Sequence, residues 1–249
     1  MTSVPMDGLD ATAVAARLGL RRVVVQAQVS STMDVAHTLA SEGADAGTLV
    51  IANEQTAGRG RGGNRWSSQA GHGLWITLLE RPESASGLDV LSLRVGLALA
   101  RPLEPFAGGA VRVKWPNDLY VGEQKLGGIL IEARWREQRP EWVAIGVGVN
   151  IDPPGDLRGA AGLSPGISRV QLLEVLVPAL RSATALRGPL SPLELEEFDR
   201  RDFARGRECT APAAGVAQGI TQDGALIIMS AGGTTHVRGG SLAFAGAAR

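Results

Sequence analysis

The sequence predicts an α+β fold, in which helices pack on a mixed or antiparallel sheet and a small β-barrel follows at the C-terminal end. β-prone and helix-prone segments are mixed along residues 10–203 without the strict β–α–β alternation that is typical of a parallel sheet. Residues 207–244 are β-prone and are divided by glycine-containing turns. The chain has 249 residues, of which 44% are hydrophobic, so it is long enough for one large domain and one small one.

The first hundred residues combine helical and β-prone segments. Asp10 and Ser31 each precede a run with helical spacing and can accept a hydrogen bond from its first turn, so both are predicted N-caps. Asp34 in the first turn supports the second of these helices. Pro102 and Pro105 are expected to end a third helix. The expected elements in order are a helix over 11–18, a strand over 21–29, a helix over 32–41, strands over 48–52 and 74–79, and a helix over 88–103.

The second half contains a hairpin, two helices and the β-prone tail. Pro116 ends a strand, and Gly122 and Glu123 mark a hairpin turn. The expected elements are a strand over 111–115, a hairpin over 119–136, a strand over 142–151, an irregular segment over 152–166, and helices over 170–186 and 192–203. Turns in the tail are expected at Gly219, Asp223–Gly224, Gly232–Gly233 and Gly239–Gly240. We therefore divide the chain into a large domain over residues 1–204 and a small one over 205–249.

Charge and cysteine content exclude several classes of protein. The 25 basic and 25 acidic residues give no net charge, so nothing global attracts the chain to nucleic acid or to a membrane. Cys209 is the single cysteine, which rules out an internal disulfide and a cysteine-rich zinc site. Residues 1–10 do not resemble a secretory signal, and no apolar run approaches the roughly 20 residues of a spanning helix. We expect a cytoplasmic protein.

A polar, glycine-rich segment over residues 53–73 carries the first chemical motif, QTAGRGRGGNRW at 55–66. Its glycines fit G-x-G-x-x-G, but a dinucleotide-binding fingerprint opens a helix, and none is expected here. The absence of a following Gly-Lys-Ser/Thr also excludes a Walker A loop. What remains is three arginines on a flexible backbone, a combination that can grip phosphate or carboxylate. From the spacing alone, a solvated basic loop or an RGG-type RNA-binding segment stays open.

Three further motifs lie at strand ends: KWPND at 114–118, KLGGILIE at 125–132 and GVGVNI at 146–151. Each has a purely structural interpretation, namely a turn with an exposed lysine, a β-bulge, and close sheet packing. Each could also serve a ligand, because lysines supply charge and alternating glycines leave one face of a strand bare.

Together, and in this order, the four motifs resemble the catalytic domain of biotin–protein ligases from about Gln28 to Asn150, and the tail resembles that family's SH3-like barrel. The resemblance implies a sheet related to that of class II aminoacyl-tRNA synthetases, with biotin and ATP sites side by side. It also implies the reaction: biotin is adenylated with ATP, and the biotinyl group is then transferred to a lysine of a biotin carboxyl-carrier domain.

The resemblance also implies which residues form the two sites. The biotin site comprises Ser31, Thr32, Met33, Gln55, Arg59, Gly60, Arg61, Trp66, Lys125, Gly127, Gly128 and Gly146. The nucleotide site comprises Arg59, Arg61, Trp66, Lys114, Asn117, Asp118, Lys125 and Asn150. Attack of a carboxylate on the α-phosphate brings two anions together, so positioned cations must offset the charge. The expected catalytic residues are therefore Lys125, Arg59, Arg61 and Lys114. Mg²⁺ bridging the phosphates supplies further charge, and no direct metal ligand is expected.

Met33 departs from the family pattern, which often has Asn at this position. Only about 27 residues precede the catalytic pattern, too few for the family's DNA-binding winged helix, so we expect a monofunctional enzyme that binds neither DNA nor membranes. A homodimer formed through an edge strand is compatible with the sequence. Two alternatives remain. One is a lipoate ligase or octanoyltransferase, which would not explain the GRGRGG loop; the other is a nucleic-acid-binding protein that uses this loop and Trp66.

Overall fold

A seven-stranded mixed sheet forms the centre of the molecule in the computed structural model, which describes residues 4–164 and 166–246. The strand order is β1-β2-β3-β7-β6-β5-β4, and only β1 and β2 pair in parallel. The strands are β1 (Val23–Val29), β2 (Thr48–Gln55), β3 (Gly73–Glu80), β4 (Val111–Lys114), β5 (Asp118–Val121), β6 (Gln124–Arg136) and β7 (Arg139–Asn150). The predicted α+β class with a mixed sheet is confirmed.

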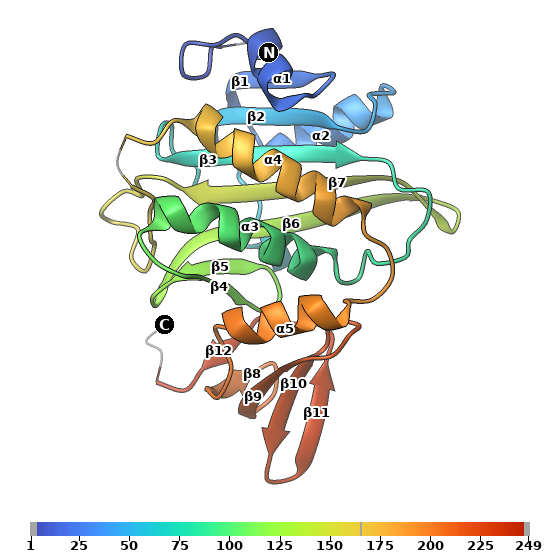
Figure 1. Ribbon diagram of the computed structural model, residues 1–249, viewed down its shortest axis with the longest axis vertical. Helices are drawn as coiled ribbons and strands as arrows, with labels where there is room; N and C mark the ends of the chain where they lie inside the picture. Colours follow the sequence, from blue (N-terminus) through green and yellow to red (C-terminus); the bar gives the residue numbers. More distant parts are fainter. Residues whose placement is uncertain (1–3, 165, 247–249) are drawn as a thin grey trace.

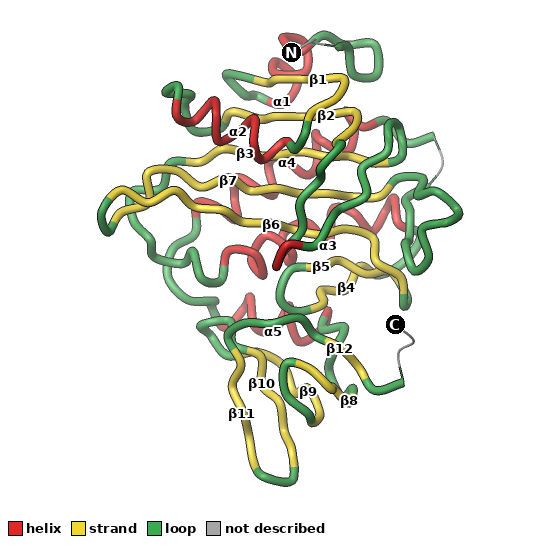
Figure 2. The backbone as a smooth tube through the Cα atoms, turned by 180° about the vertical axis from the view of Figure 1, so that it is seen from behind, coloured by secondary structure: helices red, strands yellow, loops and turns green. Residues whose placement is uncertain are grey.

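Helices cover both faces of this sheet. The helices are α1 (Ala11–Leu18), α2 (Thr32–Ser41), α3 (Leu91–Ala107), α4 (Arg169–Ala185) and α5 (Pro192–Arg201). α3 and α4 cross one face together (Figure 1), whereas α2 lies against the opposite face (Figure 2). The predicted caps are present: Asp10 Oδ1 accepts from the Ala13 amide at 2.8 Å, and Ser31 Oγ accepts from the Met33 amide at 3.3 Å. No helix within 4–164 or 166–246 is long and apolar enough to cross a bilayer.

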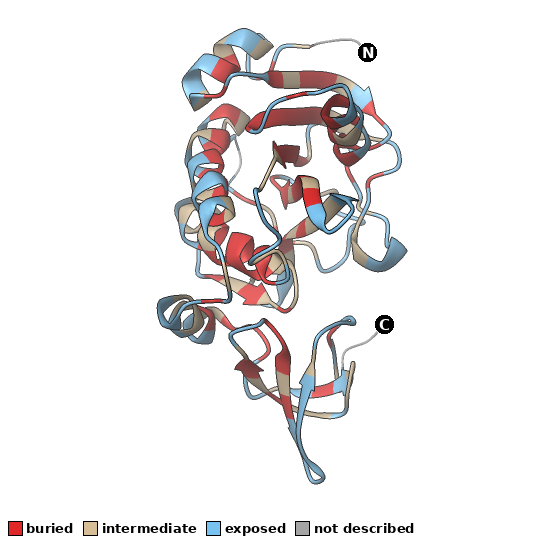
Figure 3. Cartoon of the chain, turned by 90° about the vertical axis from the view of Figure 1, so that its right-hand side faces the viewer, coloured by how far each residue is buried: buried red, intermediate tan, exposed pale blue. Residues whose placement is uncertain are grey.

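The buried side chains form two cores, one on each side of the sheet, and helices enclose both (Figure 3). The larger core lies under α1, α3 and α4, and the smaller one lies under α2. β7 contributes to the larger core through Ile145, Val147 and Val149. The alternate positions Gly146 and Gly148 have no side chain to offer the other face. That face is therefore open to groups from α2 and from the loop after β2.

Several predicted boundaries were wrong: α3 and β7 each begin three residues away from their expected starts, and the ends of α3 and β2 also differ. α3 runs through Pro102 and Pro105 to Ala107, although both prolines were expected to end it. Each proline removes one backbone hydrogen-bond donor from the helix. The burial of Leu99 and Leu103 in the larger core nevertheless keeps the C-terminal part of α3 helical. β2 extends to Gln55, three residues beyond its expected end, so the loop covers residues 56–72, and it contains a short 3-10 helix, η1 (Arg61–Gly63).

The β-prone tail forms a second, five-stranded antiparallel sheet in the order β11-β10-β9-β8-β12. Its strands are β8 (Glu208–Ala211), β9 (Gly215–Ile220), β10 (Leu226–Ser230), β11 (Gly233–Val237) and β12 (Ala243–Phe244). Gly219 lies within β9, beside a shift in the pairing register, and not in the turn expected there. The tail packs on the main sheet: Leu226 and Ile228 belong to the larger core, and Trp115 Nε1 donates to the Gly224 carbonyl at 2.9 Å.

Candidate functional site

A cavity lies on the α2 side of the sheet, beneath the loop over residues 56–72. All four sequence motifs contribute to its wall, as do the start of α2 and the tail. Its lining residues are Ser31, Thr32, Met33, Gln55, Arg59, Gly60, Arg61, Asn64, Arg65, Trp66, Ile76, Asn117, Asp118, Lys125, Gly128, Ile129, Leu130, Gly146, Val147, Gly148 and Ser241. The loop and the three strand-end motifs, far apart in sequence, therefore meet at one place.

One side of the cavity is a fixed polar cluster at the start of α2. Gln55 Oε1 accepts from the Thr32 amide at 2.8 Å and from Thr32 Oγ1 at 3.1 Å. Gln55 Nε2 donates to Ser68 Oγ at 2.7 Å, and Thr77 Oγ1 donates to Thr32 Oγ1 at 2.8 Å. These bonds fix which way each amide and hydroxyl group points, so a polar ligand here can be recognised by direction.

The floor of the cavity consists of bare strand positions. A Cβ atom on Gly146 would lie 2.9 Å from Met33 Sδ, and one on Gly148 would lie 2.6 Å from Trp66 Nε1. The indole of Trp66 therefore lies directly across β7, and a side chain there would displace it. Within the described residues, Trp66 Nε1 is buried and has no hydrogen-bond partner. Gly127 does not line the cavity. A Cβ atom added to Gly127 would lie 2.8 Å from the Gly148 carbonyl oxygen, so the absence of a side chain there allows the two strands to pack closely.

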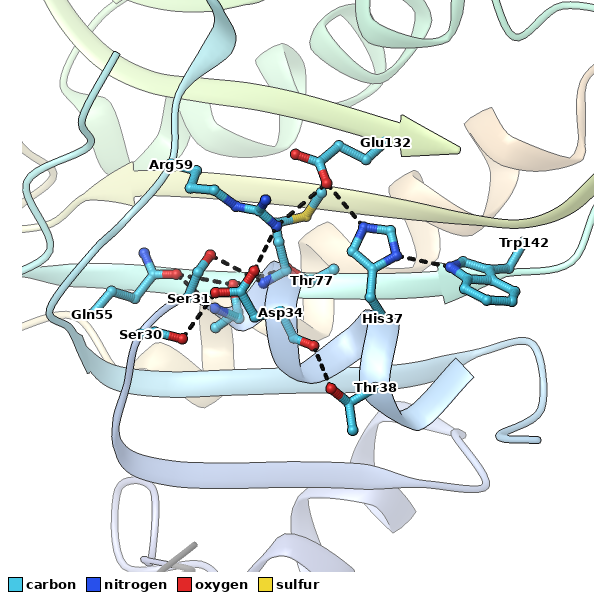
Figure 4. Close-up of polar contacts among 12 residues, drawn as sticks. Ser30, Ser31, Asp34, His37, Thr38, Gln55, Arg59, Thr77, Glu132 and Trp142 are labelled. Carbon is cyan, nitrogen blue, oxygen red and sulfur yellow. Dashed lines mark hydrogen bonds and ion pairs between the residues drawn. The ribbon is translucent and has the colours of Figure 1, made fainter. Parts of the chain in front are cut away.

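Two of the cations at the cavity, Lys125 and Arg59, are paired with carboxylates. Lys125 Nζ lies 2.7 Å from Asp118 Oδ1 and 5.1 Å from the Trp66 ring. Arg59 Nη2 lies 2.9 Å from Asp34 Oδ1 and 3.3 Å from Glu132 Oε2 (Figure 4). An anionic ligand would meet these cations in positions already set by the sheet and by α2.

Arg61 links the loop to the tail. Its guanidinium donates to the Gly240 carbonyl, and the next residue, Ser241, lines the cavity. The tail thus supplies part of the cavity wall, and the loop is attached to it.

Besides Gly127, two more predicted site residues, Lys114 and Asn150, lie outside the lining of this cavity. Lys114 Nζ is placed over the rings of Tyr120 and Phe244, at 5.4 and 5.2 Å from their centroids, because aromatic faces attract an ammonium group. Burial lowers the pKa of Lys114 from its usual value. Asn150 donates to the Lys125 carbonyl at 3.2 Å and lines a neighbouring hollow with Trp66 and Lys125. Lys114 therefore does not point at the place where the other three predicted catalytic cations meet.

Several lining residues were not singled out from the sequence. Asn64 and Arg65 belong to the glycine-rich motif, and Gly148 continues the alternation that begins at Gly146, so these three had a readable signal. No sequence signal pointed to Ser241, because it reaches the cavity through the tertiary packing of the tail. Within residues 4–164 and 166–246, no group of three or more His, Cys, Asp or Glu side chains could hold a metal ion.

Comparison with known proteins places the chain among biotin and lipoate ligases. The model of the biotin/lipoate A/B protein ligase family matches residues 25–150. The chain is 30% identical over 218 residues to a biotin–[acetyl-CoA-carboxylase] ligase of Paracoccus denitrificans, covering 79% of this chain and 90% of that protein. It is 39% identical over 137 residues to the bifunctional ligase/repressor BirA of Bacillus spizizenii, covering 55% of this chain.

The match spans only 42% of the length of the Bacillus protein. Among solved structures, the fold is similar to that of the biotin protein ligase from Aquifex aeolicus in complex with biotin and ATP. That likeness has a TM-score of 0.71 at 24% identity, and it covers 90% of this chain and 98% of the other.

Proposed function

We propose that this chain, which belongs to the biotin/lipoate A/B protein ligase family, is a biotin–protein ligase. It would activate biotin with ATP and then transfer the biotinyl group to a lysine of an acceptor protein. One observation carries the proposal: a single cavity combines the fixed polar cluster at Thr32 and Gln55 with the cations Arg59 and Lys125. A molecule that is polar at one end and carries a carboxylate at the other fits this arrangement.

The polar cluster suits the ureido group of biotin. That group offers two N–H donors and one carbonyl acceptor, and it needs matched partners, since an unpaired buried partner costs about 1–3 kcal/mol. Ser31, Thr32 and Gln55 supply hydroxyl and amide groups whose orientation is already fixed. Met33, packed on Gly146, supplies apolar surface beside them for the ring system. The biotin carboxylate then extends toward Lys125.

The proposed reaction brings two anions together. A biotin carboxylate oxygen attacks the α-phosphorus of ATP, a mixed anhydride forms, and pyrophosphate leaves. The amine of the acceptor lysine then attacks the carbonyl carbon, giving an amide, AMP and a proton. Lys125, Arg59 and Arg61 would offset the charge that develops in the first step. Mg²⁺ would enter with the ATP phosphates that coordinate it.

The nucleotide half of the site is proposed at the rim of the cavity. Trp66, with its indole N–H unpartnered among the described residues, offers a flat surface to the base, and Asn117 and Asp118 lie beside Lys125. Asn150, which bonds to the Lys125 backbone, would support this side from the neighbouring hollow. We leave Lys114 out of the proposed catalytic set, because it faces Tyr120 and Phe244.

We also propose the finer architecture and the partner. The main sheet would correspond to a class II synthetase-like catalytic domain over residues 1–204, and the tail sheet to an SH3-like barrel over 205–249. The acceptor would be a biotin carboxyl-carrier domain, a proposal supported by the name of the Paracoccus relative, which specifies an acetyl-CoA-carboxylase ligase. A cytoplasmic location and a homodimer formed through an outer strand complete the proposal.

The test is pyrophosphate release from ATP with biotin, lipoate and octanoate supplied in turn. Of the three acids, we expect only biotin to cause the release of pyrophosphate. When a purified carrier domain is added, the biotinyl group should then be transferred to it. A reaction without any acid gives the background of ATP hydrolysis. Faster release with lipoate or octanoate would replace the proposal with a lipoate-type ligase, and no release with any acid would remove the ligase activity altogether.

A further inference from the structure

A chain of polar contacts extends outward from Arg59 and away from the cavity (Figure 4). Glu132 on β6 contacts Arg59 and also the His37 ring on α2, with Oε2 2.9 Å from His37 Nε2. The other ring nitrogen, His37 Nδ1, lies 2.8 Å from the indole nitrogen of Trp142 on β7. Three elements thus converge behind a single arginine of the loop.

The contacts fix the hydrogen positions in this chain. An indole N–H can only donate, so His37 Nδ1 must be the acceptor and must carry no hydrogen. His37 Nε2 therefore carries the hydrogen and donates it to Glu132. Glu132 Oε2 consequently accepts a hydrogen bond from α2 and forms an ion pair with Arg59, so His37 helps to fix where that carboxylate lies. Trp142 is itself buried, so the far end of the chain is anchored in the smaller core.

The contacts also leave part of the arginine available. Asp34 and Glu132 both contact the same nitrogen, Arg59 Nη2. Among the described residues, Arg59 is held by these two ion pairs through Nη2 and makes no side-chain hydrogen bond through Nε or Nη1, and Arg59 lines the cavity. A guanidinium has five donors in a rigid plane, so holding one nitrogen sets the direction of the others.

We propose that Glu132 is a positioning residue: held by His37, it aims the free donors of Arg59 at the carboxylate of the substrate. This inference rests on the proposed function and assigns to it two residues, Glu132 and His37, that lie outside the cavity wall. Arg59 belongs to an irregular loop, where its long side chain would otherwise sample many rotamers. Fixing it in advance lowers the ordering cost of substrate binding.

The experiment compares Glu132→Gln with Glu141→Gln, using pyrophosphate release at varied biotin concentrations. Glu141 is the matched control, because its carboxylate pairs with Arg136 on the same two strands but outside the cavity lining. We expect Glu132→Gln to raise KM for biotin roughly tenfold, since misplacing a binding group by about 1 Å can cost up to about 100-fold. kcat should fall by a smaller factor than KM rises, because Lys125 and Arg61 stay in place, and Glu141→Gln should match the wild type.

A second comparison separates positioning from a merely structural role. In an Arg59→Ala background, Glu132→Gln should have no further effect on KM, because the residue through which it acts is gone. His37→Phe should raise KM in the same direction as Glu132→Gln and by less. Thermal unfolding of Glu132→Gln and Glu141→Gln should occur at similar temperatures.

Three results would overturn the assignment. They are a normal KM in Glu132→Gln, an equal rise in KM with and without Arg59, or a rise in KM that is accompanied by a lower unfolding temperature than in Glu141→Gln. If the wild-type chain itself releases no pyrophosphate with biotin, the proposed function fails and the positioning role fails with it. If the wild type is active and Glu132→Gln is indistinguishable from it, only the positioning role fails.

Discussion

β7 presents two opposite surfaces, although it is one continuous strand. On the core side, Ile145 and Val149 are fully buried under the helices. On the cavity side, Gly146 and Gly148 leave room for Met33 and Trp66, which come from other segments. The period of two along a strand makes this division possible, because neighbouring residues point to opposite faces. The comparison shows that one stretch of sequence can stabilise the fold with its odd positions and shape a binding site with its even ones.

The largest expected effect is on the core side. Ile145→Ala should reduce the free energy of unfolding by about 2–5 kcal/mol, since Ile145 is fully buried and the change leaves a cavity. Denaturant unfolding measures this loss. KM for biotin, measured where the variant is still folded, should stay normal, and a large change in it would mean that the two surfaces of β7 are not independent.

The next effect belongs to the cavity side. Lys125→Ala should lower the rate of biotin-dependent pyrophosphate release at least about 100-fold, the usual consequence of losing one placed charge-stabilising group. Its thermal unfolding should change little, because the Lys125 side chain is part-exposed and, among the described residues, forms a single ion pair, with Asp118. Near-normal release would contradict the proposed role of Lys125.

A buried carboxyl at the C-terminal end of α5, Asp202, should respond to pH. Burial raises the pKa of Asp202 to about 6, and Oδ2 has no partner among the described residues. Since this pKa is above that of the unfolded chain, stability falls as the pH rises from about 4 through 6, by up to roughly 3 kcal/mol. Unfolding measured across this range, relative to the non-titrating Asp202→Asn, should show the decline. A constant difference between the two proteins would argue against a raised pKa.

The smallest expected effect concerns Gly148, one of the two glycines of β7 that line the cavity. Gly148→Ala would place a Cβ 2.6 Å from Trp66 Nε1, so the indole must lift from β7. The displaced indole would no longer lie where a ligand can contact it, so substrate affinity should fall about tenfold. Overpacking of this kind would also cost roughly 1–3 kcal/mol of the free energy of unfolding. Titration with biotin and with ATP measures the fall in affinity, and denaturant unfolding measures the loss of stability. Wild-type affinity in this variant would show that the ring does not need its present position for binding.

Local signals in the sequence predicted most of the fold. Asp10 and Ser31 were identified as helix caps because capping depends on a few neighbouring residues. The extension of α3 through Pro102 was not predictable locally, since it depends on a core that forms only when distant strands and helices meet. Gly219 was assigned to a turn for the same reason, because only its pairing with β10 reveals a bulge.

The site was predicted where its chemistry lies within short motifs. Gln55, Arg59 and Lys125 reach one cavity as expected. Lys114 does not, because its direction is decided by the rings of Tyr120 and Phe244, and Phe244 belongs to the tail. His37 carried no signal in the sequence, since its importance follows from contacts with two strands that lie about a hundred positions away. The spacing of residues within a short motif predicts which of them share a site. It does not predict which side chain from another helix or strand will contact them.

The attachment of Arg61 to Gly240 has a consequence for how the protein is synthesised. A chain leaves the ribosome from its N-terminus, and 179 positions separate these two residues. At about 5–20 residues per second, the glycine-rich loop waits roughly 9–36 s for its counterpart to be synthesised. Until then the cavity also lacks the wall that Ser241 contributes. The main sheet can assemble early, but a complete substrate pocket is among the last parts of a nascent molecule to exist.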